Sequence, residues 1–209
     1  MFTGIIEEIG QIINITDNKI VISCSKVLID TKTGDSISVN GVCLTASEIG
    51  SNYFSADISK ETINVTAFRE IKNKTFVNLE RAMPANGRFG GHIVSGHIDG
   101  VGQIVELSKD NNFYNLKIRL SETLLKYCIK KGSVTIDGIS LTIAKIEKDI
   151  IKIAIIPHTF ENTNLKFLKN NSFVNIENDI FAKYIEKFLS TSDNRSRIDL
   201  SFLQQNGFA

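Results

Sequence analysis

Ser36-Ile37-Ser38-Val39-Asn40-Gly41-Val42-Cys43-Leu44-Thr45 is repeated 97 positions later as Ser133-Val134-Thr135-Ile136-Asp137-Gly138-Ile139-Ser140-Leu141-Thr142. A second stretch, Thr3 to Ile12, matches Ser95 to Ile104, and a third, Phe76 to Glu80, matches Phe173 to Glu177. Three matches in the same order indicate an internal duplication, and this duplication predicts the domain organisation more strongly than any single motif. We therefore expect two copies of one domain, over 1–90 and 91–179, followed by a tail over 180–209.

Each copy has the pattern of short strands. Leu116, Ile118 and Leu120 alternate with charged residues, which is the period of a half-buried strand. Asn40-Gly41 and Asp137-Gly138 are hairpin-turn signals between apolar runs. Short strands separated by turns predict an all-β fold, as a small closed barrel or a sandwich. One short helix is expected in each copy, from Glu122 to Lys131 and, with a weaker pattern, from Ser25 to Gly34.

The tail has a helical pattern instead. We expect an apolar stripe on one face of a helix, followed by a polar linker over 190–197 and a second short helix from Ile198 to Gln205. Because the stripe lies outside both repeats, it must pack on a barrel or on another subunit. Its members are Ile180, Phe181, Tyr184, Ile185, Phe188 and Leu189.

Composition narrows the classes of function. The 209 residues include 24 Lys and Arg and 23 Asp and Glu, for a net charge of +1, which argues against nucleic-acid or anionic-membrane binding. No apolar run approaches the ~18 residues of a membrane span, and the N-terminus lacks the basic region of a secretory signal. Three cysteines, an odd and sparse set, favour a reducing compartment. We expect a cytoplasmic protein.

Four motifs together resemble the riboflavin synthase family, alpha-chain type. They are MFTGIIEEIG at 1–10, Asn-Gly-x-Cys-Leu-Thr at 40–45, Gly-Gly-His-x-x-Ser-Gly-His at 90–97 and Asp-Gly-x-Ser-Leu-Thr at 137–142. The resemblance covers nearly the whole chain. It implies two tandem homologous six-stranded Greek-key β-barrels plus a C-terminal α-helix, assembled as a homotrimer.

The resemblance also implies a reaction. Two molecules of 6,7-dimethyl-8-ribityllumazine dismutate by transfer of a four-carbon unit, giving riboflavin and 5-amino-6-(D-ribitylamino)uracil in the last step of riboflavin biosynthesis. No cofactor and no metal are implied, and lumazine synthase is a candidate partner. A duplicated domain suits a reaction between two identical molecules, because each copy can hold one and proximity can supply much of the catalysis.

By the same resemblance, three pairs of recurring segments are expected to line the lumazine sites. The alternative is that the shared residues only build two barrels, and we prefer it for Gly41 and Gly138, whose turns need a positive φ. Lys131 is expected to reach a ligand from a neighbouring subunit, unless it is a solvated lysine at a helix end. The segments are Gly4, Ile5 and Ile6 with Gly96, His97 and Ile98; Cys43, Leu44 and Thr45 with Ser140, Leu141 and Thr142; and Asp57, Ile58, Ser59, Lys60, Glu61 and Thr62 with Ala154, Ile155, Ile156, Pro157, His158 and Thr159.

Positions at which the copies differ are the catalytic candidates, since identical substrates must act as donor and acceptor. Cys43 aligns with Ser140 and is expected to act as a nucleophile or polar contact, the alternative being a small buried hydrophobe. His97 aligns with Ile5 and is the candidate for proton transfer, the alternative being a solvated histidine at a strand end. Ser36 and Asp179 complete the set by resemblance.

Other readings are weaker. His92 and His97 are five apart, which on a strand places them on opposite sides, so no metal site is expected. The sequence assigns no role to Cys24 or Cys128. A non-catalytic lumazine- or flavin-binding protein of the same fold, or a purely structural barrel pair, remains open beside the enzyme. The enzyme is favoured because both copies keep their polar positions.

Overall fold

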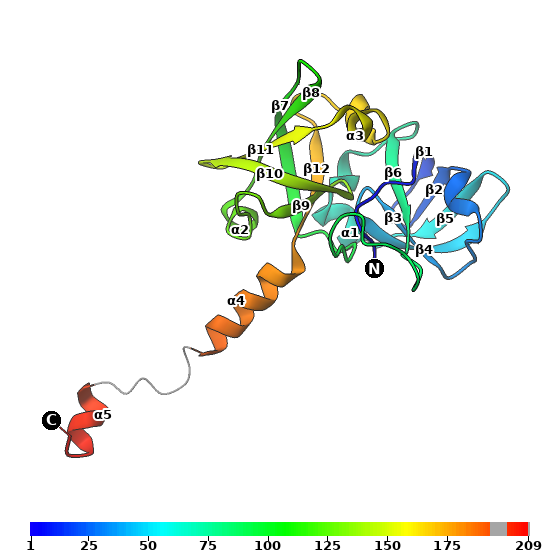
Figure 1. Cartoon of the computed structure of the whole chain (residues 1–209). Coiled ribbons are helices and arrows are strands. Elements are labelled where there is room, and N and C mark those ends of the chain that lie inside the picture. Colours follow the sequence, from blue (N-terminus) through cyan, green and yellow to red (C-terminus); the bar gives the residue numbers. More distant parts are fainter. Residues whose placement is uncertain (193–199, 209) are drawn as a thin grey trace. The chain divides into compact units, whose positions relative to one another are not determined.

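A computed structural model describes residues 1–192 and 200–208 (Figure 1). Residues Met1–Asp179 form one compact unit and Ile180–Ala209 another. The first unit holds two closed antiparallel barrels of six strands each, side by side in Figure 1. The predicted fold class is therefore confirmed, whereas the boundary that we drew at residue 90 stays a prediction.

The first barrel closes in the strand order β1-β2-β5-β4-β3-β6. Alternate residues of its strands point inward and make one apolar core, which includes Ile22, Ile37, Phe54 and Leu79 at 0% exposure. The non-sequential order, with β5 between β2 and β4, is that of a Greek key. Its strands are β1 (Glu8–Ile15), β2 (Lys19–Ser23), β3 (Ser36–Val39), β4 (Val42–Ile49), β5 (Tyr53–Asp57) and β6 (Phe76–Arg81).

The second barrel repeats this order as β7-β8-β11-β10-β9-β12. Leu116, Ile118, Ile136 and Ile176 fill its core, so the alternation seen in the sequence marks the inward face as predicted. Its strands are β7 (Gly100–Asp110), β8 (Phe113–Arg119), β9 (Ser133–Ile136), β10 (Ile139–Glu147), β11 (Ile150–Ile155) and β12 (Phe173–Asn178).

The two hairpin turns have the predicted geometry. Asn40 and Gly41 have φ values of 46° and 83°, and Asp137 and Gly138 have 45° and 80°. Positive φ at both central positions is the tight turn that matches the twist of paired strands. The turns also meet each other: a Cβ added to Gly41 would lie 2.9 Å from the Gly138 nitrogen. Glycine is thus required at this point for the two barrels to approach.

Helices between the strands are short. Two expectations were wrong here: the helix expected from Glu122 to Lys131 is a single turn, and the one from Ser25 to Gly34 is a short 3-10 helix. The strand that follows must begin at residue 133, and Lys131 takes a left-handed φ of 71° that no helix contains. The short helices are η1 (Lys26–Leu28), α1 (Lys60–Val65), η2 (Ala67–Glu70), α2 (Glu122–Leu125), α3 (Pro157–Glu161) and η3 (Asn164–Phe167).

The second unit contains α4 (Ile180–Ser192) and α5 (Leu200–Gln205). The predicted stripe lies on α4, with Tyr184, Ile185 and Leu189 between 57% and 66% exposed. Helix α4 includes residues 190–192, which we expected to belong to the polar linker, so this part of the expectation was wrong. Residues 193–199 lie outside the described part of the chain, as does the expected start of the second helix at Ile198. None of the described helices has the length and apolar character needed to cross a membrane.

Candidate functional site

Two short segments before the first strand of each barrel organise the site. We call residues 1–6 the first arm and residues 93–98 the second arm. Glu80 accepts hydrogen bonds from the Thr3 nitrogen at 2.7 Å and the Gly4 nitrogen at 3.0 Å. Glu177, its equivalent, binds Ser95 and Gly96 at the same two distances. Each arm is therefore fixed to its own barrel by one buried carboxylate, and burial raises the pKa of Glu80 despite these bonds.

Each arm also crosses to the opposite barrel. The Gly4 carbonyl accepts a hydrogen bond from the Ser140 nitrogen at 2.8 Å, and the Gly96 carbonyl accepts one from the Cys43 nitrogen at 2.9 Å. The contacts are too close for a side chain, because a Cβ on either glycine would lie 2.6 Å from the partner's Cβ. The barrels are therefore interlocked through two equivalent junctions.

The arms carry apolar side chains across with them. Ile6 packs against the core of the second barrel, and Ile98 packs against the core of the first. Phe2 and Val94 pair with each other, and both are fully buried. Ile6 and Ile98, which we expected to meet the ligand, thus have a packing role in the interlock.

The junction between Gly96 and Cys43, which we call the first junction, brings together two of the predicted catalytic residues. Cys43 is bound to the carbonyl of Gly96, and His97 is the next residue along the arm. Cys43 is half-buried and His97 is exposed, so neither side chain is enclosed in a barrel core. The repeat pattern alone does not predict that Cys43 and His97 are close. They are close because the second arm crosses to the first barrel.

The second junction, between Gly4 and Ser140, contains a histidine that we did not predict as a site residue. His92 Nδ1 lies 2.7 Å from Ser140 Oγ, and its Nε2 lies 3.2 Å from Thr135 Oγ1. Burial lowers the pKa of His92, and the charge of Asp179 opposes that shift. A neutral imidazole against a serine hydroxyl is able to accept its proton. Ser140 therefore has an imidazole in hydrogen-bond contact, whereas Cys43 has a histidine one residue beyond its backbone partner Gly96.

We missed His92 because, in arguing against a metal site, we placed His92 and His97 on a strand. The segment that contains them forms only an isolated bridge at Val94, so alternation does not apply to it. The Gly-Gly-His-x-x-Ser-Gly-His spacing itself was the available signal, since it places an imidazole near the start and another near the end of the second arm.

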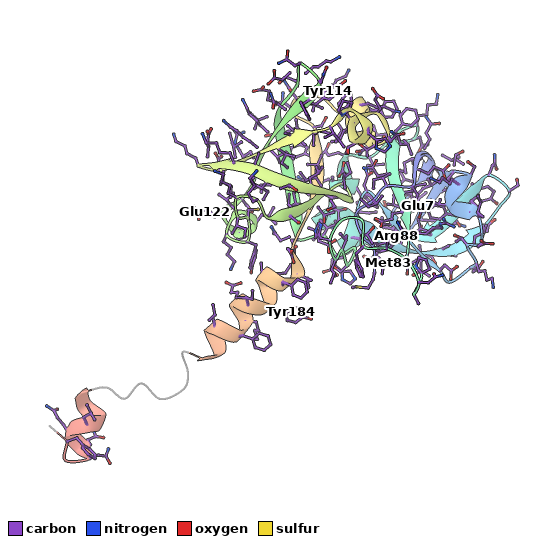
Figure 2. All side chains as sticks on the ribbon, in the orientation of Figure 1. Glu7, Met83, Arg88, Tyr114, Glu122 and Tyr184 are labelled. Atoms are coloured by element: carbon purple, nitrogen blue, oxygen red, sulfur yellow. The ribbon has the colours of Figure 1, made fainter. Side chains whose placement is uncertain are left out.

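A cavity of about 700 Å³ opens beside the first arm. Of the predicted residues, Ile5 and Ser36 line it, and its other walls come from the loop at 29–35 and the connection at 82–90. Figure 2 labels three of its lining residues, Glu7, Met83 and Arg88, on the first barrel. Its volume lies within the range of about 300–1,000 Å³ that small-molecule sites occupy.

An ion pair makes one wall of this cavity rigid. Arg81 binds Glu7 through Nε and Nη2, at 3.0 and 2.6 Å, and its Nη1 donates to the Ile29 carbonyl. Burial would raise the pKa of Glu7, but the hydrogen bonds and charge of Arg81 hold it below its ordinary value. In the second barrel Asn178 stands at the position of Arg81 and binds Asp99 through its backbone nitrogen. The two barrels thus offer different electrostatic surroundings to a ligand.

Strand register places other predicted residues in a row on each barrel. Thr45 pairs with Ser36, and Thr142 pairs with the equivalent Ser133. The hydroxyls of Thr45 and Thr142 lie on exposed residues, as a ligand contact requires. Four predicted residues point into the barrel cores instead, at 9% exposure or less, which leaves only their backbone for a ligand: Leu44, Ile58, Leu141 and Ile155.

The segment at 57–62 has a structural task as well. Ser59 caps helix α1: its Oγ accepts from the Thr62 nitrogen at 3.0 Å and lies 2.9 Å from Thr62 Oγ1. Ile156 and Pro157 begin α3 at the equivalent place, without a side-chain cap. Lys131 is exposed, and its backbone nitrogen binds the Ile143 carbonyl in the way that Gly34 binds Ala46.

The three cysteines differ in accessibility. Cys24 and Cys128 are buried, and burial raises the pKa of both thiols, that of Cys24 to about 12. Cys43 is the half-buried one of the three. Among residues 1–192 and 200–208, no three His, Cys, Asp or Glu side chains gather in a way that could hold a metal ion.

The comparisons with known proteins agree with this geometry. A model of the lumazine binding domain matches the chain twice, over residues 3–82 and 95–179. Riboflavin synthase of Actinobacillus pleuropneumoniae is 50% identical, with 100% of both chains covered. The chain belongs to the riboflavin synthase family. The resemblance drawn from the four motifs is thereby confirmed.

A further relative and two solved structures also match. Riboflavin synthase of Bacillus subtilis is 42% identical over the full length of both chains. Among solved structures, LumP complexed with riboflavin has a TM-score of 0.79 at 30% identity, covering 85% of this chain and 99% of that one. LumP complexed with 6,7-dimethyl-8-(1'-D-ribityl) lumazine has a TM-score of 0.77 at 30% identity, with 85% and 98% covered.

Proposed function

We propose that this protein converts two molecules of 6,7-dimethyl-8-ribityllumazine to riboflavin and 5-amino-6-(D-ribitylamino)uracil. One substrate gives a four-carbon unit to the other, and the atoms of two substrates equal those of the two products, so no oxidant or cofactor is needed. The observation that carries the proposal is the pair of junctions. Each joins both barrels: at one, Ser140 Oγ lies against the His92 imidazole, and at the other, Cys43 is bound through its backbone nitrogen to Gly96, the residue before His97.

The residues take different roles at the two junctions. Cys43 contacts the acceptor ring, as nucleophile or polar partner, and His97 moves a proton there. Ser140, polarised by His92, does the corresponding work at the other junction. Ser36 and Asp179 bind polar groups of the substrates, Ser36 from the cavity wall and Asp179 near His92. The different charges of the Arg81 and Asn178 positions support unequal roles for the two barrels.

The assembly that we propose is a homotrimer. A site between the first barrel of one subunit and the second barrel of its neighbour can hold two substrates face to face, with Lys131 reaching across. The apolar stripe on α4 supports association, because burying a large apolar side chain is worth roughly 1.5–3 kcal/mol before the cost of association. Head-to-tail contacts of this kind close into rings.

The direct test is incubation of the purified protein with the lumazine alone, while riboflavin fluorescence is recorded. We expect riboflavin to accumulate without any added cofactor. The similarity to LumP gives the competing outcome a concrete form: a protein that binds the lumazine tightly but makes no riboflavin over hours is a binding protein of this fold.

The proposed roles have their own variants. Cys43→Ser and His97→Gln should each lower turnover by at least about tenfold and leave the fold intact, because the equivalent positions carry Ser140 and Ile5. Circular dichroism checks the fold, and the purified variants are assayed beside the wild type. Unchanged turnover in both variants would remove the two residues from the site.

Truncation tests the assembly. Deleting 180–209 should leave two folded barrels that bind lumazine but have lost most of the trimer and most turnover. Light scattering on the same sample reports the mass. A fully active monomer would show that the site lies within one chain.

Two further predictions concern the setting of the reaction. A cytoplasmic location is consistent with three unpaired cysteines, and fractionation of cells tests it. Association with lumazine synthase, which would supply the substrate, is testable by co-sedimentation of the two purified proteins.

A further inference from the structure

A second cavity, of about 290 Å³, lies where the barrels meet and takes no part in the proposed reaction. Both barrels line it with equivalent residues: Phe76 and Phe173 form walls, and Asn40 and Asp137 lie in its interior. The two phenylalanines are each 37% exposed, whereas Asn40 and Asp137 are 5% and 2% exposed. The cavity therefore has an apolar, aromatic opening and a buried polar floor.

The floor belongs to a network of buried amides that joins the barrels. Asn78 Nδ2 donates to the Asp137 carbonyl at 2.8 Å, and Asn175 Nδ2 donates to the Asn40 carbonyl at 2.9 Å. These bonds are equivalent in the two repeats. Buried polar groups that satisfy one another in this way fix a unique arrangement of the elements that carry them.

Asn164 breaks the equivalence. Its Nδ2 donates to Asp137 Oδ2 at 2.8 Å and lies 3.3 Å from Asn40 Oδ1, so it connects the two side chains. The first repeat has Ala67 at the corresponding position, and Ala67 lines the cavity. No amide of the first repeat therefore stands where Asn164 stands in the second.

The consequence is an unused donor on Asn40. Its Oδ1 accepts from the Asn78 nitrogen at 2.7 Å, which fixes the orientation of the amide and identifies the other atom as Nδ2. Within residues 1–192 and 200–208, Asn40 Nδ2 has no hydrogen-bond partner, although the residue is 5% exposed and lines the cavity. Among the described residues, the buried side-chain atom without a partner is Asn178 Oδ1, so Asn40 Nδ2 keeps contact with the solvent of the cavity, where a ligand can accept its hydrogen bond.

The side chains of Asn40 and Asp137 together define which hydrogen-bonding groups a ligand would need. Asn40 Nδ2 presents a donor, and Asp137, once it has lost its proton above about pH 7, presents an acceptor with spare lone pairs beside Asn164. The two are close, because both side chains hydrogen-bond the same Nδ2 of Asn164. We propose that this cavity binds a single planar ring that carries a hydrogen-bond acceptor and an N–H donor side by side, as a pyrimidine base does.

Size and walls agree with that chemistry. The volume is at the lower end of the range for small-molecule sites, which suits one ring without a long substituent. Phe76 stacks on Phe167 with ring centroids 4.1 Å apart, and Arg69 lies over Phe173 at 5.5 Å. Both aromatic walls are thus held in place for stacking against a flat ligand.

Calorimetry of the full-length protein with uracil tests the proposal. Riboflavin is present in excess so that the catalytic pockets are filled. We expect saturable binding of uracil, and at least about tenfold weaker binding of 1,3-dimethyluracil, which keeps the carbonyls but has lost both N–H groups. Cytosine serves as the second probe and tells whether the acceptor is a carbonyl or a ring nitrogen.

Two variants locate the site. Phe173→Leu, at a partly exposed wall, should fold and weaken uracil binding several-fold while riboflavin formation stays unchanged. Asn40→Asp keeps the shape of the side chain and removes the donor, so binding should be lost. Absence of saturable uracil and cytosine binding, or equal binding by Phe173→Leu and the wild type, would overturn the proposal. Because riboflavin formation is measured separately, failure here leaves the proposed reaction unaffected.

Discussion

Replacing Asp137 by Asn tests the physical account of the barrel junction. Asp137 is 2% exposed, and neutral amides donate its hydrogen bonds: Asn175 donates to Oδ1 and Asn164 to Oδ2, both at 2.8 Å. Burial raises the pKa of this carboxyl from 3.8 to about 7, and the hydrogen bonds from Asn164 and Asn175 oppose the rise. Glu70, at the rim of the same cavity, is the other carboxyl that lines it.

The sign of the pH effect follows from linkage. Between about pH 4 and pH 7 the folded protein keeps a proton that the unfolded chain has lost, so stability falls as the pH rises through this window and is level above it. The whole window is worth on the order of 4 kcal/mol, at about 1.36 kcal/mol per pH unit. The part between pH 5 and pH 7 amounts to about 2–3 kcal/mol.

Asp137→Asn removes this titration and one hydrogen bond with Asn164, worth about 1 kcal/mol at any pH. The difference in unfolding free energy between variant and wild type should therefore shift in favour of the variant by about 2–3 kcal/mol between pH 5 and pH 8.5. Urea unfolding at both pH values measures it, at one protein concentration because association stabilises the folded state. An equal difference at both pH values would refute the reasoning. Asn40→Asp, which adds a second carboxyl to the network, should have the opposite pH trend.

Three other outcomes are expected. Gly96→Ala should lower the free energy of unfolding by roughly 2–5 kcal/mol, from left-handed strain and the 2.6 Å contact at Cys43, and a Tm within experimental error of the wild type would contradict the interlock. His92→Gln should lower kcat and remove the loss of rate on the acid side of pH 6.5, whereas an unchanged pH profile would exclude His92 from proton transfer. Iodoacetamide should alkylate Cys43 well before Cys24 or Cys128, as mass spectrometry of the peptides will show; labelling of all three at one rate would mean that the barrels open.

Several features of the site were readable from local sequence. The Asn-Gly and Asp-Gly turns need two positive φ values, and few other residue pairs supply them, so chemistry alone predicts the hairpins at residues 40–41 and 137–138. Cys43 was nominated because the copies differ there, and it is the accessible cysteine. These predictions succeed because they depend on the chain within a few residues of the position concerned.

Features that depend on distant contacts were not readable. Ile6 and Ile98 are apolar, but their pattern cannot tell which barrel covers them, and each packs on the opposite one. His92 was set aside by an alternation rule that holds only in strands, and its partners Ser140 and Thr135 are more than 40 residues away. The one-turn length of α2 was missed because the position of the next strand ends the helix before its sequence pattern does.

The sequence by itself determined the duplication, the all-β character of each copy, the hairpin turns and the helical tail, because periodicity and turn chemistry act over short distances. Only the tertiary structure decided that the arms exchange between barrels, that Cys43 meets Gly96 and Ser140 meets Gly4, and that Asn40 keeps an unused donor. The physical reason is that a pattern specifies which face of an element is apolar or polar. Which surface covers that face depends on how the two barrels pack against each other. Equivalent residues of the two repeats, almost 100 positions apart, contribute equally to that packing.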